Sequence, residues 1–166
     1  MWRVGACYAV LLGLALGYGL PAHATRFDFA AGRSVPGPAA GDADAATVAF
    51  LTAAGLPGAA AQVRLQLVGT LGWIGSHDVD RGGLDRPAFV AGGGARYRFF
   101  RRLFVSEQII ATSVRTSALS SRFEFMTTLG VHVGRFLLMG RHISNAHLIG
   151  GGPNHGETML LVGVEF

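Results

Sequence analysis

This chain of 166 residues has a single cysteine and no lysine, and charged residues make up only 14% of it. The single cysteine, Cys7, lies inside an apolar N-terminal segment. The rest of the chain therefore has neither a disulfide nor a thiolate metal site. With no lysine, the net charge of +4 comes from arginine alone.

Residues 1–24 have the organisation of a secretory signal peptide. Arg3 supplies the charged start, 10–19 form the apolar stretch, and a small Ala-His-Ala triplet closes the segment. A retained membrane anchor is the alternative, but the apolar stretch is short for a span and Pro21 follows it directly. The sequence therefore predicts a cleaved signal peptide and a single mature domain at 25–166.

Long apolar runs are missing from the mature part. The nearest candidate for a transmembrane helix, 45–63, is interrupted by Gly55, Pro57 and Gly58, although the chain has a mean hydropathy of +0.39. An exported domain without disulfides needs another source of stability, and a bilayer acting as solvent is one. A closed transmembrane β-barrel meets both conditions because it hides apolar surface in alternate residues.

The arginines suit a surface that faces phosphorylated lipid, because a guanidinium group binds phosphate through two-point contacts. A bias toward arginine across the source proteome explains their number equally well. Export places the protein away from nucleic acid, so a sequence pI of about 10.2 does not indicate a nucleic-acid partner.

Alternation of apolar and polar residues predicts the strands. In 64–73, Leu65, Leu67 and Trp73 share one face, while Gln66 and Thr70 occupy the other. The same alternation recurs in 88–99 and 122–133, and weaker strands are predicted at 25–32, 47–54, 102–114, 134–144 and 157–166. These eight segments predict an all-β fold, an eight-stranded antiparallel transmembrane β-barrel with outward loops at 33–46, 75–86 and 150–156.

The last predicted strand indicates in which membrane the barrel is inserted. Leu160, Val162, Val164 and Phe166 alternate up to a terminal aromatic residue, which resembles the signal read by the bacterial outer-membrane insertion machinery. We therefore expect the protein in the bacterial outer membrane, surrounded by outer-membrane lipids.

His142 and Ser144 form the main candidate for chemistry. Two residues apart on a strand, they point to the same face as Phe136 and Leu138, which we expect to face lipid. A histidine beside a serine hydroxyl is the arrangement of an activated nucleophile. Because polar side chains are costly against lipid, a lipid substrate gives these two a reason to be there.

Two neighbours complete the predicted site. Glu157 is placed to orient the imidazole across a hairpin loop, and Asn145 offers an amide to an oxyanion. Strict alternation gives Glu157 the parity of Glu165 rather than that of the outward Phe166. Because a lipid-facing histidine would otherwise lack an orienting partner, we predict that a bulge near Gly156, or a strand that begins only after Glu157, turns Glu157 outward. The alternative is that Glu157 is not the third member.

The segment 142–146, HISNA, with the Gly/Pro/Asn loop and the terminal strand after it, resembles the end of the PagL-type lipid A 3-O-deacylases. The resemblance implies an outer-membrane barrel that hydrolyses the 3-O-linked acyl chain of lipid A in lipopolysaccharide. It implies catalysis by His142, Ser144 and Glu157, with Asn145 at the oxyanion, without a metal or other cofactor. It also allows a homodimer. In this chain the loop order is Pro-Asn-His-Gly rather than Asn-Pro-Gly, and Glu157 lies one position further from the serine.

Other polar residues receive structural interpretations. His147 and His155 lack ligand-like spacing and are expected to be solvated loop residues. Glu107 shares the parity of outward residues, but a slipped register or a lumen position is favoured over contact with the site. A lumen charge network is predicted for Arg64, Arg96, Arg98, Arg122 and Glu124.

Two other functions stay open. A small non-enzymatic barrel with a structural or adhesive role would carry the His142 and Ser144 pair without chemistry. An acyltransferase that binds its substrate in the lumen is less favoured, because the pair is expected to face outward.

Overall fold

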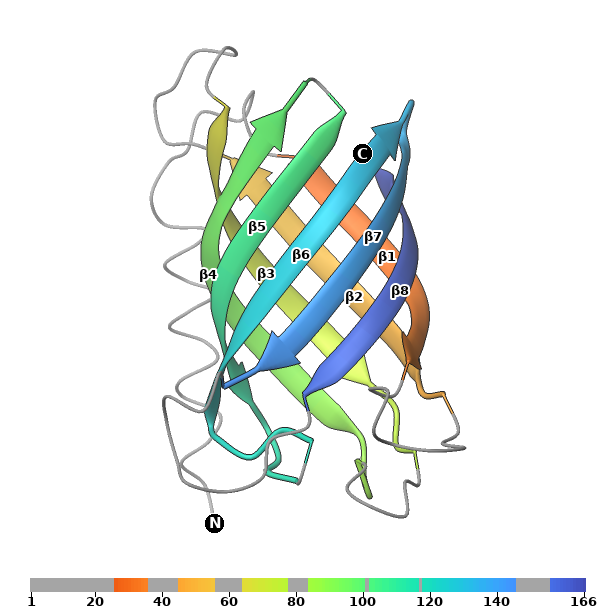
Figure 1. Cartoon of the computed structure of the whole chain (residues 1–166), viewed down its shortest axis with the longest axis vertical. Coiled ribbons are helices and arrows are strands. Elements are labelled where there is room, and N and C mark those ends of the chain that lie inside the picture. The colour runs from red at the N-terminus through yellow and green to blue at the C-terminus, as the bar shows by residue number, and fades with distance from the viewer. Residues whose placement is uncertain are drawn as a thin grey trace.

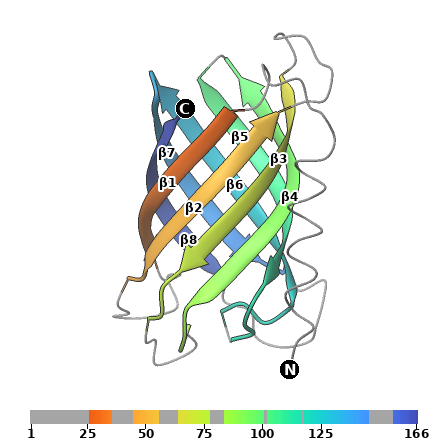
Figure 2. The same ribbon diagram turned by 180° about the vertical axis from the view of Figure 1, so that it is seen from behind.

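The computed structural model describes residues 26–35, 45–55, 64–77, 84–100, 102–116, 118–145 and 156–166. Each strand is antiparallel to the next, and β8 pairs with β1, so the sheet closes into a barrel (Figures 1 and 2). This confirms the predicted all-β, eight-stranded antiparallel barrel. The strands are β1 (Arg26–Val35), β2 (Thr47–Gly55), β3 (Leu65–Ile74), β4 (Ala88–Phe99), β5 (Leu103–Thr112), β6 (Phe123–Val133), β7 (Phe136–Ser144) and β8 (Glu157–Glu165).

The strand boundaries follow the predictions closely, with β1 as the main exception. β1 continues through Val35 because its ladder with β8 continues to the pair of Val35 and Thr158, so residues 33–35 are strand rather than loop. The predicted signal peptide at 1–24 lies outside the described residues. In the part of the chain that is described, no helix is long and apolar enough to cross a membrane.

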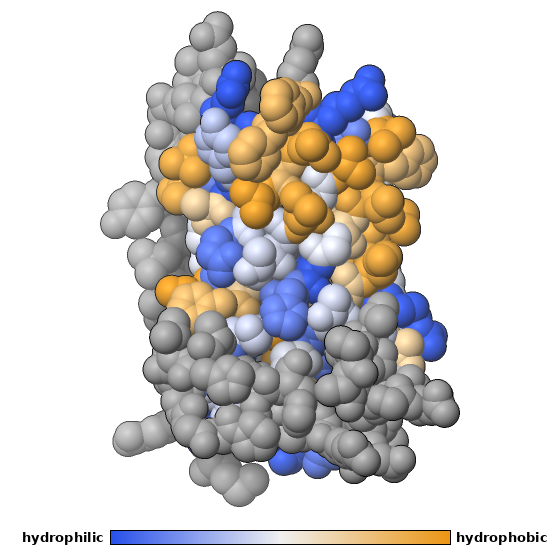
Figure 3. Space-filling model, viewed as in Figure 1, coloured by the Kyte–Doolittle hydropathy of each residue, from blue (hydrophilic) through white to orange (hydrophobic). Residues whose placement is uncertain are grey.

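The outer wall of the barrel is mainly apolar. In β7, Phe136 and Leu138 are 66% and 51% exposed, whereas Leu137 and Met139 between them are buried. Figure 3 shows the resulting apolar band over the upper part of the face formed by β5–β8. Such a wall matches lipid hydrocarbon, as in barrels of the outer membrane.

The two ends of the barrel differ. β5 begins four positions after the end of β4, and Gly134 and Arg135 connect β6 to β7, where the positive φ of 66° at Gly134 favours glycine. These short turns lie at the same end as the C-terminus (Figure 1). β7 runs from there to the opposite end, where the longer connections lie, so Ser144 is at the loop end. In outer-membrane barrels the longer loops face outside the cell.

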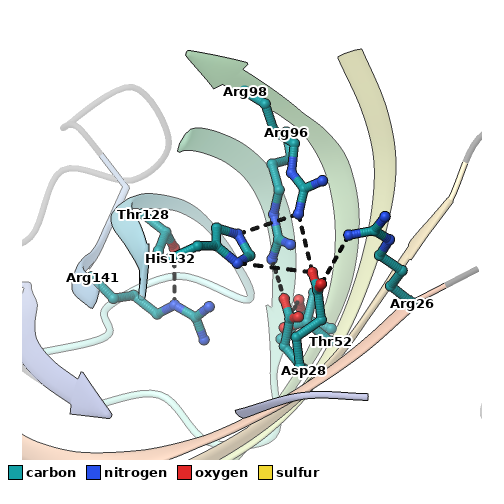
Figure 4. Close-up of polar contacts among 10 residues, drawn as sticks. Arg26, Asp28, Thr52, Arg96, Arg98, Thr128, His132 and Arg141 are labelled. Carbon is teal, nitrogen blue, oxygen red and sulfur yellow. Dashed lines mark hydrogen bonds and ion pairs between the residues drawn. The ribbon is translucent and has the colours of Figure 1, made fainter. Parts of the chain in front are cut away.

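Charged side chains cross the lumen (Figure 4). The guanidinium of Arg96, which is 1% exposed, donates to Asp28 Oδ2 over 2.6 Å and lies 4.4 Å from the centroid of the Phe104 ring. Arg98 donates to Glu165 Oε2 over 3.0 Å. The lumen is therefore a packed interior in which ion pairs join strands that are not neighbours.

The predicted lumen charge network is confirmed in part. Arg96 and Arg98 belong to it, and the buried Glu124 accepts hydrogen bonds from Ser121. The prediction is wrong for Arg64 and Arg122, which are exposed because they precede the first residues of β3 and β6.

Candidate functional site

His142 and Ser144 share the outer face of β7, as predicted. His142 is exposed and Ser144 is half-buried, and the residues between and beside them, Arg141 and Ile143, are buried. Both residues lie among the last three of β7, which finishes at the barrel end that carries the longer loops. Their orientation toward the lipid-facing side is confirmed, and their catalytic roles stay predictions.

Four polar side chains cross this wall in one row, which we call the outer polar row: Glu107, Thr127, His142 and Thr158. Each pairs in register with the next on the neighbouring strand, from β5 to β8. Thr127 Oγ1 donates to Glu107 Oε2 over 2.6 Å. Figure 3 shows polar side chains interrupting the apolar surface in the middle of this face. The candidate pair therefore belongs to a larger polar patch on an apolar wall.

The His142 imidazole is held from two sides. Its Nδ1 lies 2.9 Å from Thr158 Oγ1. On the other side, a Cβ added at Gly156 would lie 2.8 Å from Cε1 and 3.1 Å from Nε2, so the ring packs closely against this backbone. If Nδ1–H donates to Thr158, Nε2 keeps its lone pair and is available as a base.

Glu157 does not face outward, and the prediction of a bulge that turns it toward His142 is wrong. β8 keeps strict alternation from its first residue, and Glu157 pairs with the buried Ile143. Its side chain is 3% exposed and accepts a hydrogen bond from Ser34, while its other oxygen lies 3.2 Å from His77 Nε2. Gly156 has a positive φ of 65°, but it lies before the first pair of the β7–β8 ladder and does not shift the register. Thr158, not Glu157, is therefore the outward residue paired with His142.

The contact of Glu157 with His77 predicts a pH dependence of stability. His77 lies in the β3–β4 connection, and the hydrogen bond to Glu157 raises its pKa above the ordinary 6.5, although burial acts in the opposite direction. The stabilisation is therefore complete below about pH 6.5 and is lost as the pH rises through the raised pKa. We expect the stability difference between wild type and His77→Gln to be larger at about pH 6 than at about pH 9. Urea unfolding in detergent at both pH values measures it, and a difference independent of pH contradicts the assignment.

Asn145 is also turned away from the outer face. Its side chain is fully buried, and Nδ2 donates to Ser120 Oγ over 2.9 Å. This placement gives no support to the predicted role of its amide at an oxyanion beside Ser144.

Glu107 shows the opposite error. Its expected lumen position is wrong, because its side chain is exposed on the outer wall and binds Thr127. Thr127 and Thr158 were missed altogether. Each has the parity of apolar outward residues on its strand, so the argument that singled out His142 would have found them if applied to every strand.

The described residues contain no group of three or more His, Cys, Asp and Glu side chains that could hold a metal ion. His147 and His155, and the loop order that departs from the PagL type, lie mostly outside the described part of the chain.

No protein-family profile matches the chain, and no curated protein matches it in sequence. Among solved structures it is similar to the crystal structure of Ail, the attachment invasion locus protein of Yersinia pestis, in complex with the heparin analogue sucrose octasulfate. The identity is 12% and the TM-score 0.47, over 86% of this chain and 97% of that one. It is also similar to the backbone structure of the Yersinia pestis outer membrane protein Ail in a phospholipid bilayer nanodisc, with 11% identity and a TM-score of 0.48, over 85% and 99% of the two chains. Its own closed barrel and apolar outer wall make this chain an eight-stranded β-barrel protein of the bacterial outer membrane.

Proposed function

We propose that the protein is an outer-membrane serine esterase that removes the 3-O-linked acyl chain of lipid A. Ser144 is the nucleophile and His142 the base. The observation that carries the proposal is the joint placement of these two side chains on the outer face of β7, beside exposed Phe136 and Leu138. The resemblance of segment 142–146 to the PagL-type deacylases names the substrate.

The setting supports a lipid as the substrate. A water-soluble ester would have to leave water to reach a side chain on the lipid-facing wall, whereas lipid A is already part of the surrounding membrane. His142 and Ser144 lie at the loop end, where a lipid would place its ester groups between headgroup and hydrocarbon. Beside His142, Gly140 leaves open space on the outer wall, since a Cβ added there would meet nothing within 4 Å. An acyl chain can lie in this space.

The reaction follows from the two side chains. Ser144 Oγ attacks the ester carbonyl carbon while its proton moves to His142 Nε2. The bond between the carbonyl carbon and the sugar oxygen then breaks, and the leaving oxygen takes the proton from His142. Water repeats the sequence on the acyl-serine, which releases the fatty acid and restores the hydroxyl.

Mass spectrometry of lipid A tests the proposal. Lipid A from cells that express the protein is expected to lose the mass of one hydroxyacyl chain relative to cells without it. An unchanged spectrum, from cells in which the barrel is inserted in the outer membrane, contradicts the proposal.

A non-enzymatic barrel with a structural or adhesive role is the second candidate. The inward position of Glu157 favours it, because the Ser-His-Glu triad implied by the resemblance is not assembled. The two candidates differ in one result, since only the esterase changes the mass of lipid A.

A glycine pair offers a matched test of the His142 contact. Gly156→Ala and Gly134→Ala both place a side chain at a positive φ, of 65° and 66°, so backbone strain should cost each variant about 1–2 kcal/mol of stability. The methyl group at 156 would lie 2.8 Å from both His142 Cε1 and the backbone oxygen of Ile143, whereas that at 134 meets nothing within 4 Å. We expect Gly156→Ala to slow deacylation by about 100-fold through displacement of the base. Gly134→Ala should keep the wild-type rate, and equal rates for the two variants contradict the contact.

A further inference from the structure

A carboxylate on the lipid-facing wall is the feature that the proposed reaction leaves unused. Of the acidic residues in the eight described strands, Asp28, Glu124 and Glu157 are buried and Glu165 pairs with Arg98 in the lumen. Glu107 alone has its side chain on the outer face. A carboxylate beside lipid is costly unless donors or a positive charge face it, so such a residue is best explained by a role.

Its surroundings point to His142. Glu107 accepts a hydrogen bond from Thr127 over 2.6 Å, and the register then places Thr127 opposite His142. No ion pair of Glu107 with a basic side chain is formed among the described residues. Because neighbouring strands are about 4.8 Å apart, Glu107 and His142 start from backbones about 10 Å apart on the same side of the wall.

We propose that Glu107, held by Thr127, is the positioning carboxylate of this site. Its negative charge stabilises the positively charged imidazole that forms when His142 takes the serine proton. The assignment rests on the proposed function and gives the site the acid that Glu157, on the other side of the wall, does not supply. Thr127 fixes the carboxylate in the row, and neither residue touches the reacting atoms.

The size of the effect follows from Coulomb's law. Two unit charges about 10 Å apart, at an effective dielectric constant of about 20, change a rate by on the order of tenfold. Since the imidazolium exists in the transition state and not in the bound ester, the loss should fall on kcat rather than on KM.

Kinetics on purified protein with lipid A in detergent micelles test the assignment. Glu107→Gln keeps the shape and removes the charge, so kcat is expected to fall about tenfold with KM changed less than about twofold. Glu107→Asp, which keeps the charge, should recover part of the rate. Thr127→Val should also lower kcat, with little further loss when it is combined with Glu107→Gln, because both changes remove one coupled unit.

Asp85→Asn is the matched control, since it removes one negative charge from an exposed position outside the strands. Its kcat should equal that of wild type. An unchanged kcat in Glu107→Gln, or a rise in KM alone, overturns the assignment, provided that the folded barrel keeps its mobility on an unheated gel.

The ring-nitrogen NMR signals of His142 separate this inference from the proposed function. We expect Glu107→Gln to move these signals and Asp85→Asn to leave them in place. An inactive wild-type protein would defeat the esterase proposal, yet moved signals would still support the pairing of Glu107 with His142. Signals unchanged in Glu107→Gln overturn the pairing whether or not the wild type is active.

Discussion

Ser144→Ala is expected to lower lipid A deacylation by at least about 1000-fold and to leave the barrel folded. The substitution removes the atom that attacks the ester carbonyl, and water cannot replace a nucleophile positioned beside a base. The side chain forms no hydrogen bond with the described residues and is only half-buried, so its loss leaves no partner unsatisfied. Release of fatty acid from lipid A by the purified protein in micelles measures the rate.

Ser76→Ala provides the matched control. Ser76 is an exposed serine just beyond β3, and its replacement should leave the rate unchanged. Both variants should show the wild-type difference in gel mobility between heated and unheated samples, which reports a folded barrel. A Ser144→Ala barrel that deacylates at a rate close to that of wild type would show that another group is the nucleophile.

Asp28→Ala is expected to have the largest effect on stability, a loss of about 3–5 kcal/mol. Asp28 is 2% exposed and forms a 2.6 Å ion pair with Arg96, which is 1% exposed. Two other nitrogens of Arg96, Nε and Nη1, have no partner among the described residues. Without Asp28 the guanidinium would therefore remain charged inside the lumen, with the Phe104 ring as its main contact.

Urea unfolding in lipid vesicles measures this loss, with Asp85→Ala as the control. Asp85 pairs with Arg86 over 3.8 Å at the surface, and such an exposed pair contributes about 0–1 kcal/mol. Equal losses in the two variants would show that the lumen pair contributes no more than an exposed one.

The eight strands could be predicted because alternation is a local property of the sequence. In a barrel strand, successive side chains face lipid and the packed lumen in turn. Any two neighbouring residues, one apolar and one polar, therefore indicate which face is which, as in β3 and β6. The same parity placed His142 and Ser144 on the outer face. The pairing of Asp28 with Arg96, 68 residues apart and across the lumen, depends on closure of the barrel and has no local signal.

Glu157 shows what happens when parity and resemblance disagree. Alternation gives Glu157 the parity of the inward Glu165, whereas the predicted bulge near Gly156 would supply the outward His142 with an orienting partner. In the structure the β8 ladder starts directly at Glu157, where Ser34 and His77 provide partners inside the barrel. These partners come from distant parts of the chain, so alternation indicates the inward position of Glu157 but no local pattern shows which groups pair with it.

Glu107 shows the reverse. Its parity is outward, yet from the sequence we favour a slipped register or a lumen position over contact with the site. The partner that makes the outward position acceptable is Thr127, and this contact depends on the register between β5 and β6. An outward polar residue in a barrel strand is therefore informative once its neighbours across the ladder are known.

Labelling with a long-chain fluorophosphonate tests the central claim most directly, because this reagent reacts with a serine that a base has activated. The folded protein in micelles would be treated with the reagent, digested, and mapped by mass spectrometry. We predict one adduct, on Ser144, and its absence when His142 is replaced with alanine. A folded wild-type barrel that takes up no adduct at Ser144, or takes it up equally without His142, would contradict an activated serine on the lipid-facing wall.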